Sequence, residues 1–277
     1  MKKARRLLEE AMPGQDVVIE LLDARMPRAS ENPVLAEIRG RKPCVKVLSK
    51  SDLADPEVTR LWIEHLERRE SARTDDSGRV VAIAVSTDRA AEARKRVAEA
   101  CSAIAAPPTR GRKTPRAMIV GIPNVGKSTL VNVLARRQVA KVGDEPAVTK
   151  QKQLVMLDNG MALSDNPGIM WPRIEDPRSG MRLAFGGAIP DSAIDYESVA
   201  LFGAGLLLAT YPELLATRYK LPSMPADADA LLDEIGRRRG CLRAGGVIDR
   251  HKAADVLIHD FRAGAIGRIS LERPKSG

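Results

Sequence analysis

The chain has 277 residues, enough for two domains, since a single hydrophobic core usually stops growing beyond about 250 residues. A hydrophobic fraction of 44% excludes wholesale disorder, and an aromatic fraction of 3% argues against a stacking platform for single-stranded bases. The formal net charge of +9 favours a polyanionic partner, with nucleic acid as the first expectation and an anionic membrane surface as the second.

Cysteines and apolar runs bear on the compartment. The three cysteines are odd in number and far apart, which is typical of reduced thiols in the cytosol: Cys44, Cys101 and Cys241. The basic start of the chain lacks the apolar core of a signal peptide because Glu9 and Glu10 interrupt it. The longest apolar run, residues 199–210, is shorter than the ~20 residues that span a bilayer and suits a buried core helix. We therefore expect a cytoplasmic protein without a membrane partner.

Short runs rich in β-branched residues predict strands, each followed by polar or helix-like sequence. In chain order they lie at residues 16–23, 44–49, 79–86 and 116–122. This alternation predicts a parallel sheet with helices on its faces, and therefore an α/β fold class. A helical pattern at 89–105 ends in a basic, proline-rich stretch that we expect to be an exposed linker.

The segments KQLVMLD and MALSD flank an Asn-Gly pair at 159 and 160 and predict a hairpin. Beyond residue 174 the pattern becomes helical, with no further clear strand. We expect a nucleotide-binding domain at 1–174 and a smaller helical domain at 175–277.

A phosphate-binding motif occupies residues 121–129, GIPNVGKST, called the phosphate loop below. It satisfies G-x-x-x-x-G-K-[ST] between a predicted strand and a predicted helix, which disfavours a chance glycine turn. In such a loop backbone N–H groups surround the phosphates, Lys127 offers a positive charge to the outer phosphates, and Ser128 ligates magnesium. The chain is therefore predicted to bind a nucleoside triphosphate. The expected nucleotide contacts are Asn124, Val125, Gly126, Lys127, Ser128 and Thr129.

A second phosphate motif follows in LSDNPGI. Asp165 ends a predicted strand, where a phosphate-loop protein holds magnesium directly or through water, and the N–H of Gly168 can meet the γ-phosphate. Thr149 lies between the two motifs and could complete the magnesium shell, with an ordinary loop hydroxyl as the alternative.

The residues that read the base are expected before the phosphate loop. A carboxylate that accepts from guanine N1–H and its exocyclic amine would be poorly paired with adenine, so it discriminates between the bases. The segment SKSD closes the second predicted strand, although a helix start capped by Ser51 or Asp52 is a competing interpretation. A second base loop is expected at the end of the next strand. The predicted base contacts are Ser49, Lys50, Asp52, Ser86 and Thr87.

This motif order resembles the circularly permuted GTPases. The segments LLDARMPRASENP, GIPNVGKSTLVN, DNPGIMWPRIED and RRGCLRAGGVID are similar to the YlqF/RbgA family of ribosome-assembly GTPases, and the resemblance runs over nearly the whole chain. It implies a GTPase that uses GTP or GDP with Mg²⁺ and matures the large ribosomal subunit. It also implies that the C-terminal helical domain and basic surfaces grip ribosomal RNA. Our leading hypothesis is that GTP favours docking on an immature large subunit and that hydrolysis favours release. We expect a monomer.

Several positions depart from the family pattern or bear on catalysis. Ser49 replaces an Asn that bonds the base and braces the phosphate loop, and Asn166 replaces a Thr. Ile169 stands where Ras-like proteins place a water-orienting Gln. The family is thought to supply a His from an N-terminal aromatic-Pro-Gly-His-Met segment, and Met1 matches the Met after that His. The catalytic residue is therefore unassigned.

These departures leave two functions open. The first is a GTPase with slow intrinsic hydrolysis that the ribosomal subunit stimulates. The second is a nucleotide-sensing RNA-binding factor with little or no intrinsic hydrolysis. An adenine-specific kinase or ATPase is disfavoured by Lys50 and Asp52.

Three further features bear on function, and the last two carry alternatives. Asn124 resembles an asparagine that helps hold a potassium ion beside the phosphates in related GTPases. Asp23 and Arg25 carry a family signature and could form a structural ion pair or act electrostatically in hydrolysis. A basic cluster near paired glycines is a solvated face or an RNA phosphate contact: Arg237, Arg238, Arg239, Arg243, Arg250 and Lys252.

Overall fold

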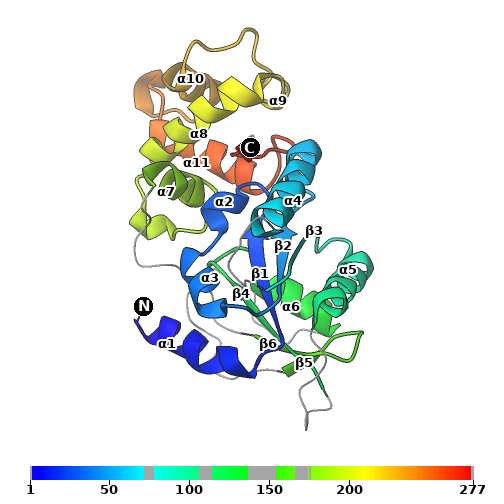
Figure 1. The fold of residues 1–277 in the computed structure, drawn as a ribbon. Helices are drawn as coiled ribbons and strands as arrows, with labels where there is room; N and C mark the ends of the chain where they lie inside the picture. Colours follow the sequence, from blue (N-terminus) through cyan, green and yellow to red (C-terminus); the bar gives the residue numbers. More distant parts are fainter. Residues whose placement is uncertain are drawn as a thin grey trace. The chain divides into compact units, whose positions relative to one another are not determined.

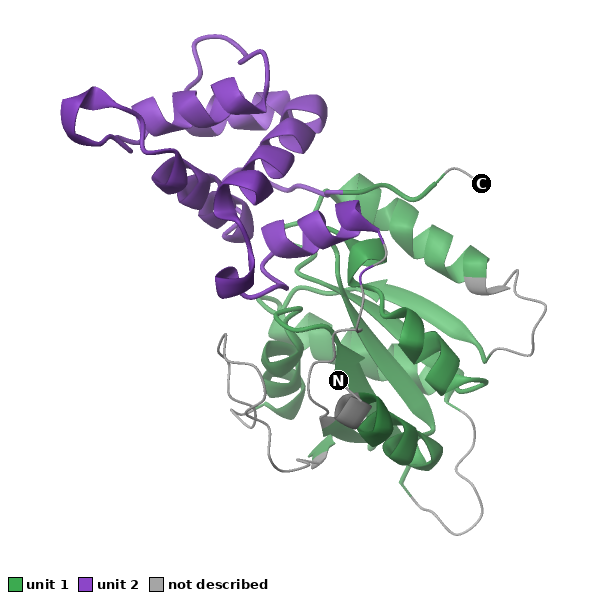
Figure 2. Cartoon of the chain, turned by 90° about the vertical axis from the view of Figure 1, so that its left-hand side faces the viewer, with its two compact units in different colours: residues 1–173, 272–277 green, residues 174–271 purple. Residues whose placement is uncertain are grey.

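The computed structural model describes residues 2–71, 78–105, 114–136, 154–165, 174 and 176–275. The chain divides into two compact units, drawn in different colours in Figure 2. The first unit comprises residues 1–173 together with 272–277, and the second comprises 174–271.

The first unit contains a six-stranded sheet within the described residues, so the predicted α/β class is confirmed. The strands are β1 (Val17–Asp23), β2 (Cys44–Ser49), β3 (Val80–Ala84), β4 (Arg116–Gly121), β5 (Leu154–Met156) and β6 (Ala162–Asp165). Their order is β3-β2-β1-β4-β6-β5, and every neighbouring pair is parallel except β5 with β6. The carboxyl ends of β1, β2, β3, β4 and β6 therefore share one edge of the sheet.

All of the strands predicted from sequence form, including the hairpin of β5 and β6. Its turn contains Asn159 and Gly160, and Gly160 adopts a φ of +77°, which glycine tolerates without steric cost. The Asn159 carboxamide accepts from the backbone N–H of Met161 at 3.1 Å and so closes the turn.

Helices cover both faces of the sheet (Figure 1). In chain order they are α1 (Lys2–Ala11), the 3₁₀ turn η1 (Met12–Gly14), α2 (Pro27–Ser30), α3 (Pro33–Arg39), α4 (Pro56–Ser71), α5 (Ala90–Ile104) and α6 (Lys127–Ala135). Leu8 of α1 and Leu35 of α3 share a buried cluster with Val18 of β1. Helix α5 packs against α6. The apolar side chains of β1 and β2 are thus removed from water on both faces, which explains why both strands are mostly apolar.

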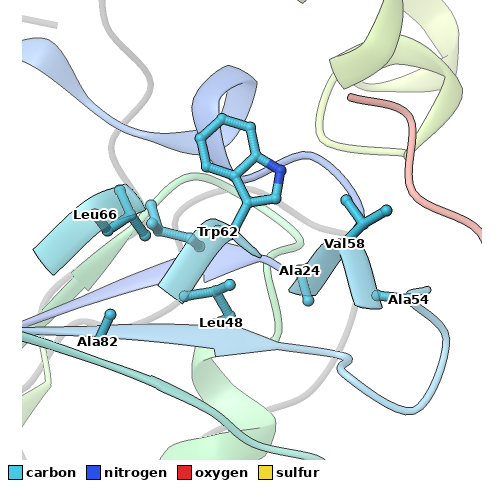
Figure 3. Packing of buried hydrophobic residues seen from close by; sticks show 8 residues of the cluster. Ala24, Leu48, Ala54, Val58, Trp62, Leu66 and Ala82 are labelled. Atoms are coloured by element: carbon cyan, nitrogen blue, oxygen red, sulfur yellow. The ribbon is translucent and has the colours of Figure 1, made fainter. Parts of the chain in front are cut away.

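Helix α4 is held by a second buried cluster on the same face as α1 and α3. Its residues are Leu22, Ala24, Leu48, Ala54, Val58, Trp62, Leu66 and Ala82. Figure 3 shows that the labelled residues come from both the helix and the strands beneath it. Burying one large apolar side chain stabilises a fold by about 1.5–3 kcal/mol. This cluster holds α4 against the sheet. It also holds the end of β2, which leads into the loop before α4.

A buried ionic network lies on this face as well. Lys46 of β2 is 3% exposed, and its Nζ donates to Glu20 of β1 at 2.8 Å and to Glu31 at 2.6 Å. Arg69 of α4 also donates to Glu31. Burial tends to raise the pKa of Glu31, but the hydrogen bond from Arg69 and the charge of Lys46 outweigh it and lower this pKa to about 2. The network ties α4 and the segment after α2 to the centre of the sheet.

The second unit is helical in its described part, apart from an isolated bridge between Leu242 and Ile248. Its elements are α7 (Pro177–Phe185), η2 (Asp191–Ala193), α8 (Tyr196–Thr210), α9 (Pro212–Tyr219), α10 (Ala228–Arg238), η3 (Ala244–Gly246) and α11 (Arg250–Arg262). Helix α8 packs against α7, α9, α10 and α11, and its buried residues confirm the prediction of a core helix. Within the described residues no single helix is long and apolar enough to cross a membrane. Among these residues, helices α8 and α9 taken together are long and apolar enough, but the chain bends by 113° between them.

The chain returns to the first unit at Glu272. The indole Nε1 of Trp62 donates to the backbone carbonyl of Glu272 at 3.1 Å. The Glu272 carboxylate accepts from the backbone N–H groups of Arg28 and Ala29, the latter at 3.0 Å. These N–H groups begin the short helix α2 and have no partner within it. Residues 272–277 are therefore part of the unit that carries the sheet.

Candidate functional site

The phosphate loop has the strand–loop–helix context that its motif requires. Strand β4 ends at Gly121 and helix α6 begins at Lys127. A Cβ on Gly121 would lie 2.9 Å from Val125 Cγ1 and 3.0 Å from the carbonyl oxygen of Leu21, so no larger residue fits without a shift. Gly126 has a φ of +94° and precedes α6, and Asn124 has a φ of +56°. The backbone therefore makes the tight turn that, in loops of this type, leaves the first amides of the helix available to a phosphate.

The first turn of α6 carries the expected phosphate and magnesium residues. Lys127 is 8% exposed, and Ser128 and Thr129 are half-buried. The Gly126 carbonyl already accepts from the N–H of Leu130 at 2.9 Å, so the helix is regular from its start. The N–H groups of a first helical turn have no partner inside the helix, and phosphate oxygens are suitable acceptors for them.

The end of β2 contacts the phosphate loop through two consecutive side chains. The hydroxyl of Ser49 lies 2.7 Å from the carbonyl oxygen of Val125 and 2.9 Å from that of Leu22. A hydroxyl has one proton, so Ser49 donates to one of these carbonyls at a time. Lys50 Nζ donates to the carbonyl oxygen of Asn124 at 2.9 Å. The segment SKSD and the phosphate loop, separated by more than seventy positions in the chain, are thus in direct contact.

Asp23, at the end of β1, completes this arrangement. Its side chain is 1% exposed and accepts from Arg25 through the backbone N–H, Nε and Nη2 at 3.0, 3.0 and 2.9 Å. It also accepts from Lys50 Nζ at 3.0 Å. Burial tends to raise the pKa of Asp23, but the charges of Arg25 and Lys50 outweigh it, and the pKa lies far below its usual range. Asp23 and Arg25 therefore form the buried ion pair that was one of the two sequence interpretations.

Asp52 lies on the exposed loop that follows β2. Helix α4 begins at Pro56, and its first N–H groups are capped by Asp55, whose carboxylate accepts from Glu57 at 2.9 Å and Val58 at 3.1 Å. The competing interpretation, in which Ser51 or Asp52 caps a helix, is therefore wrong, because the cap lies further along the chain.

The structure brings the loop after β3, which is the predicted second base loop, beside the loop after β2. Strand β3 pairs with β2, the N–H of Val85 donates to Leu48 at 2.9 Å, and the N–H of Ser51 donates to Val85 at 3.3 Å. Ser86 and Thr87 follow directly and are half-buried. The loops after β2, β3 and β4 therefore meet at one edge of the sheet, as the sequence order of a permuted site requires.

Some predicted residues lie outside the described part of the chain: Met1, Thr149, Asn166, Gly168 and Ile169. Asp165 ends β6, and its backbone is in register with Ile119 of β4, the strand that enters the phosphate loop. The hydroxyl of Ser128 and a carboxylate at position 165 are oxygen ligands of the kind that Mg²⁺ prefers, so these residue types fit the ion.

Sequence reasoning missed the contact between Asp23 and Lys50. The available signal was the position of Asp23 at the end of one predicted strand and of Lys50 at the end of the next. Side chains at the ends of adjacent parallel strands lie close together, and the register of β1 with β2 places Asp23 beside Ser49.

All five arginines of the basic cluster in the second unit, and Lys252, are ion-paired. Arg250 donates to Glu197, Asp229 and Asp233 at 2.6, 2.6 and 3.2 Å. The other pairs are Arg237 and Arg238 with Glu234, Arg239 with Asp260, and Arg243 and Lys252 with Asp249. The side chains of Arg237, Arg243 and Lys252 are 58%, 64% and 66% exposed, whereas that of Arg250 is 29% exposed. The side chains of Arg238 and Arg239 are 32% and 33% exposed, so the cluster divides into three partly buried arginines and an exposed set of Arg237, Arg243 and Lys252.

Comparison with known proteins reveals similarity over the whole chain. Residues 116–194 match the family described as 50S ribosome-binding GTPase. Ribosome biogenesis GTPase A of Bacillus pumilus is 42% identical, covering 100% of this chain and 97% of the relative. The protein of that name from Thermotoga maritima is 28% identical, covering 99% and 92%.

Solved structures agree. A GDP-bound structure of TM YlqF has a TM-score of 0.68 at 25% identity, covering 98% of this chain and 100% of that one. A GNP-bound structure of YlqF from T. maritima has a TM-score of 0.67 at 26% identity, covering 99% of each. This similarity establishes that the chain belongs to the ribosome biogenesis GTPase A (YlqF/RbgA) family and is a GTPase that acts in ribosome biogenesis.

Proposed function

We propose that this GTPase binds guanine nucleotide at the shared edge of β2, β3 and β4, with Asp52 and Lys50 reading the base and the phosphate loop holding the phosphates. The observation that carries the proposal is the pair of contacts from Ser49 to Val125 and from Lys50 to Asn124. They tie the base motif to the phosphate motif, so one nucleotide can reach both. Ser86 and Thr87 line the base, and Gly168 meets the γ-phosphate.

The proposed site includes cations. Ser128, Thr149 and Asp165 hold Mg²⁺, which neutralises charge on the phosphates when bound. Asn124 holds a K⁺ ion that acts as a further positive charge beside them. Support for the potassium site comes from the left-handed backbone of Asn124, which belongs to the same turn that exposes the loop amides.

We further propose that GTP favours docking of the protein, as a monomer in the cytoplasm, on an immature large ribosomal subunit, and that hydrolysis favours release. Hydrolysis is slow alone and faster on the subunit. Exposed basic residues of the second unit contact ribosomal RNA phosphates. The descriptions "50S ribosome-binding GTPase" and "Ribosome biogenesis GTPase A" of the similar proteins support this proposal.

Base selectivity is tested by titrating GTP, GDP and ATP against a fluorescent GDP analogue on the intact chain and on Asp52→Asn. We expect guanine nucleotides to compete at least about a hundredfold better than ATP, and Asp52→Asn to remove most of that preference because the paired donors of guanine lose their acceptor. Equal competition by ATP would refute the assignment of SKSD as the base motif.

The ribosomal part is tested by turnover. GTP hydrolysis is measured alone, with large subunits isolated from cells depleted of this protein, and with mature small subunits as the control. The proposal is supported if the large-subunit particle stimulates hydrolysis and the small subunit does not. Binding without stimulation would favour the second function, a nucleotide-sensing RNA-binding factor. The same assay in K⁺ and in Na⁺ tests the potassium site, and equal rates in the two salts would exclude it.

A further inference from the structure

We propose that Asp23 is a positioning residue for the phosphate loop, acting through Lys50. This inference rests on the proposed assignment of residues 121–129 as the loop that holds the phosphates. None of the described hydrogen bonds of Asp23 reaches the carbonyls of Asn124 and Val125 in that loop. Asp23 accepts from Lys50 Nζ at 3.0 Å, and the same Nζ donates to the carbonyl of Asn124 at 2.9 Å.

The lysine needs a second partner to be held in this place. Its side chain is 25% exposed and its backbone has a φ of +55°, so Lys50 sits on a turn and is only partly packed. A flexible lysine side chain loses up to about 2 kcal/mol of rotamer entropy when it is ordered. A single bond to the Asn124 carbonyl would offset little of that cost, because a typical hydrogen bond contributes about 1 kcal/mol net. The buried carboxylate of Asp23 supplies a charge-assisted bond and directs Nζ at the loop.

Asp23 itself is fixed from several sides. Arg25 is 1% exposed and donates to both carboxylate oxygens, and the backbone N–H of Asp23 donates to Ser30 Oγ at 3.0 Å. Ser30 in turn donates to the carbonyl of Met26 at 2.9 Å. The carboxylate therefore has a single orientation, and Lys50 is the one of its two cationic neighbours among the described residues that reaches the phosphate loop.

The consequence lies in the loop amides. Asn124 has a left-handed backbone, and its carbonyl is held by Lys50 while that of Val125 is held by Ser49. Fixing two successive carbonyls fixes the peptide planes that carry the following N–H groups, which face the phosphates in a loop of this type. Without Asp23 the lysine has one partner fewer, and the first of these two planes is less constrained.

The chain provides a matched control on the same two strands. Glu20 of β1 is 4% exposed and accepts from Lys46 Nζ of β2 at 2.8 Å, so it too is a buried carboxylate paired with a lysine of the neighbouring strand. Within the described contacts Lys46 bonds Glu20 and Glu31 and makes no contact with the phosphate loop. Asp23→Asn and Glu20→Gln therefore remove the same kind of charge from the same strand. They differ in what the lysine touches and in the additional pairing of Asp23 with Arg25, which Lys50→Met leaves intact.

The experiment measures the dissociation constant of GDP, urea unfolding without nucleotide, and amide hydrogen exchange of residues 121–129, for the intact chain, Asp23→Asn, Glu20→Gln, Lys50→Met and Asp23→Asn/Lys50→Met. We expect both single carboxylate variants to be destabilised. We expect Asp23→Asn to weaken GDP binding by about tenfold and to speed exchange in the loop, and Glu20→Gln to change affinity by less than about twofold. In the Lys50→Met background, Asp23→Asn should weaken GDP binding by less than a further factor of about two, because the connection from Asp23 through Lys50 to the loop is already broken.

Equal affinity losses in Asp23→Asn and Glu20→Gln, or a full additional loss in the double variant, would overturn the inference. If Asp23→Asn does not fold, Lys50→Met keeps the Asp23–Arg25 pair, and unchanged exchange of the nucleotide-free loop in that variant would overturn it equally. Failure of the intact chain to bind GDP would instead refute the proposed function and is distinguishable from either result.

Discussion

The hydroxyl oxygen of Ser49 lies 2.7 Å from the carbonyl oxygen of Val125, so a serine supports the phosphate loop where the family pattern has an asparagine. We expect Ser49→Ala to weaken GDP binding about fivefold, since one buried hydrogen bond contributes about 1 kcal/mol. Calorimetric titration of both proteins measures the difference. Ser49→Asn restores the family residue and should bind at least as well as the intact chain, and a loss as large as that of alanine would contradict the supporting role.

Gly121 is predicted to tolerate no side chain. In Gly121→Ala the new Cβ would meet Val125 Cγ1 at 2.9 Å and the Leu21 carbonyl at 3.0 Å, and the backbone of β1 cannot move away cheaply. The phosphate loop would shift instead, so we expect at least about a tenfold loss of GDP affinity. Gly14→Ala is the control, since nothing lies within 4 Å of its Cβ position, and it should bind normally. Equal binding by both variants would contradict the packing argument.

The network around Lys46 predicts a pH dependence of stability. The pKa of Glu31 is lowered from 4.5 to about 2 in the folded chain, so the unfolded chain binds the proton first as pH falls. The stabilisation from Glu31 is fully present above its unfolded pKa and is lost between there and about pH 2. Between about pH 6 and about pH 3 this loss is on the order of 2 kcal/mol. Urea unfolding should therefore be less pH-dependent over that range in Glu31→Gln, and identical slopes would exclude this source.

Glu272 is expected to stabilise the first unit through the start of α2. Glu272→Ala leaves the N–H groups of Arg28 and Ala29 without their carboxylate and should cost about 1 kcal/mol of unfolding free energy. Glu272→Gln keeps an oxygen acceptor at the same position and should cost less. Thermal unfolding of the three proteins checks this order, and a glutamine variant as unstable as the alanine variant would show that charge rather than hydrogen bonding matters.

Arg250 and Arg237 should separate stability from RNA binding. Arg250→Gln leaves three carboxylates without their shared arginine and should destabilise the second unit by about 1–2 kcal/mol. Arg237→Gln removes an exposed charge that pairs with Glu234 one turn earlier in the same helix. It should change stability by less than about 0.5 kcal/mol. Unfolding measurements check both values. Under the proposed function, Arg237→Gln weakens binding to ribosomal RNA, and retention of full RNA affinity would remove Arg237 from the contact surface.

The strands of the sheet and the phosphate loop could be predicted because local sequence patterns determine them. The runs at Val17–Asp23 and Cys44–Ser49 are mostly apolar and rich in β-branched residues, and the strand–loop–helix around Gly121 has a fixed geometry. The contact of Asp23 with Lys50 depends on strand register, which only the packed sheet defines. Pairing of Arg250 with three carboxylates depends on how α8, α10 and α11 meet, so sequence proximity to other arginines could not distinguish an internal residue from an exposed one.

The return of the chain at Glu272 affects how the protein can be dissected. The helical unit is inserted between residue 173 and residue 272 of the first unit, and both flanks of the insertion belong to the nucleotide-binding fold. A shortened protein that stops at residue 173 would lose the acceptor of the Trp62 indole and the acceptor of two α2 amides as well as the helical unit. Replacing residues 174–271 by a flexible Gly-Ser linker would instead retain the returning segment, and is the sounder way to isolate the nucleotide-binding half.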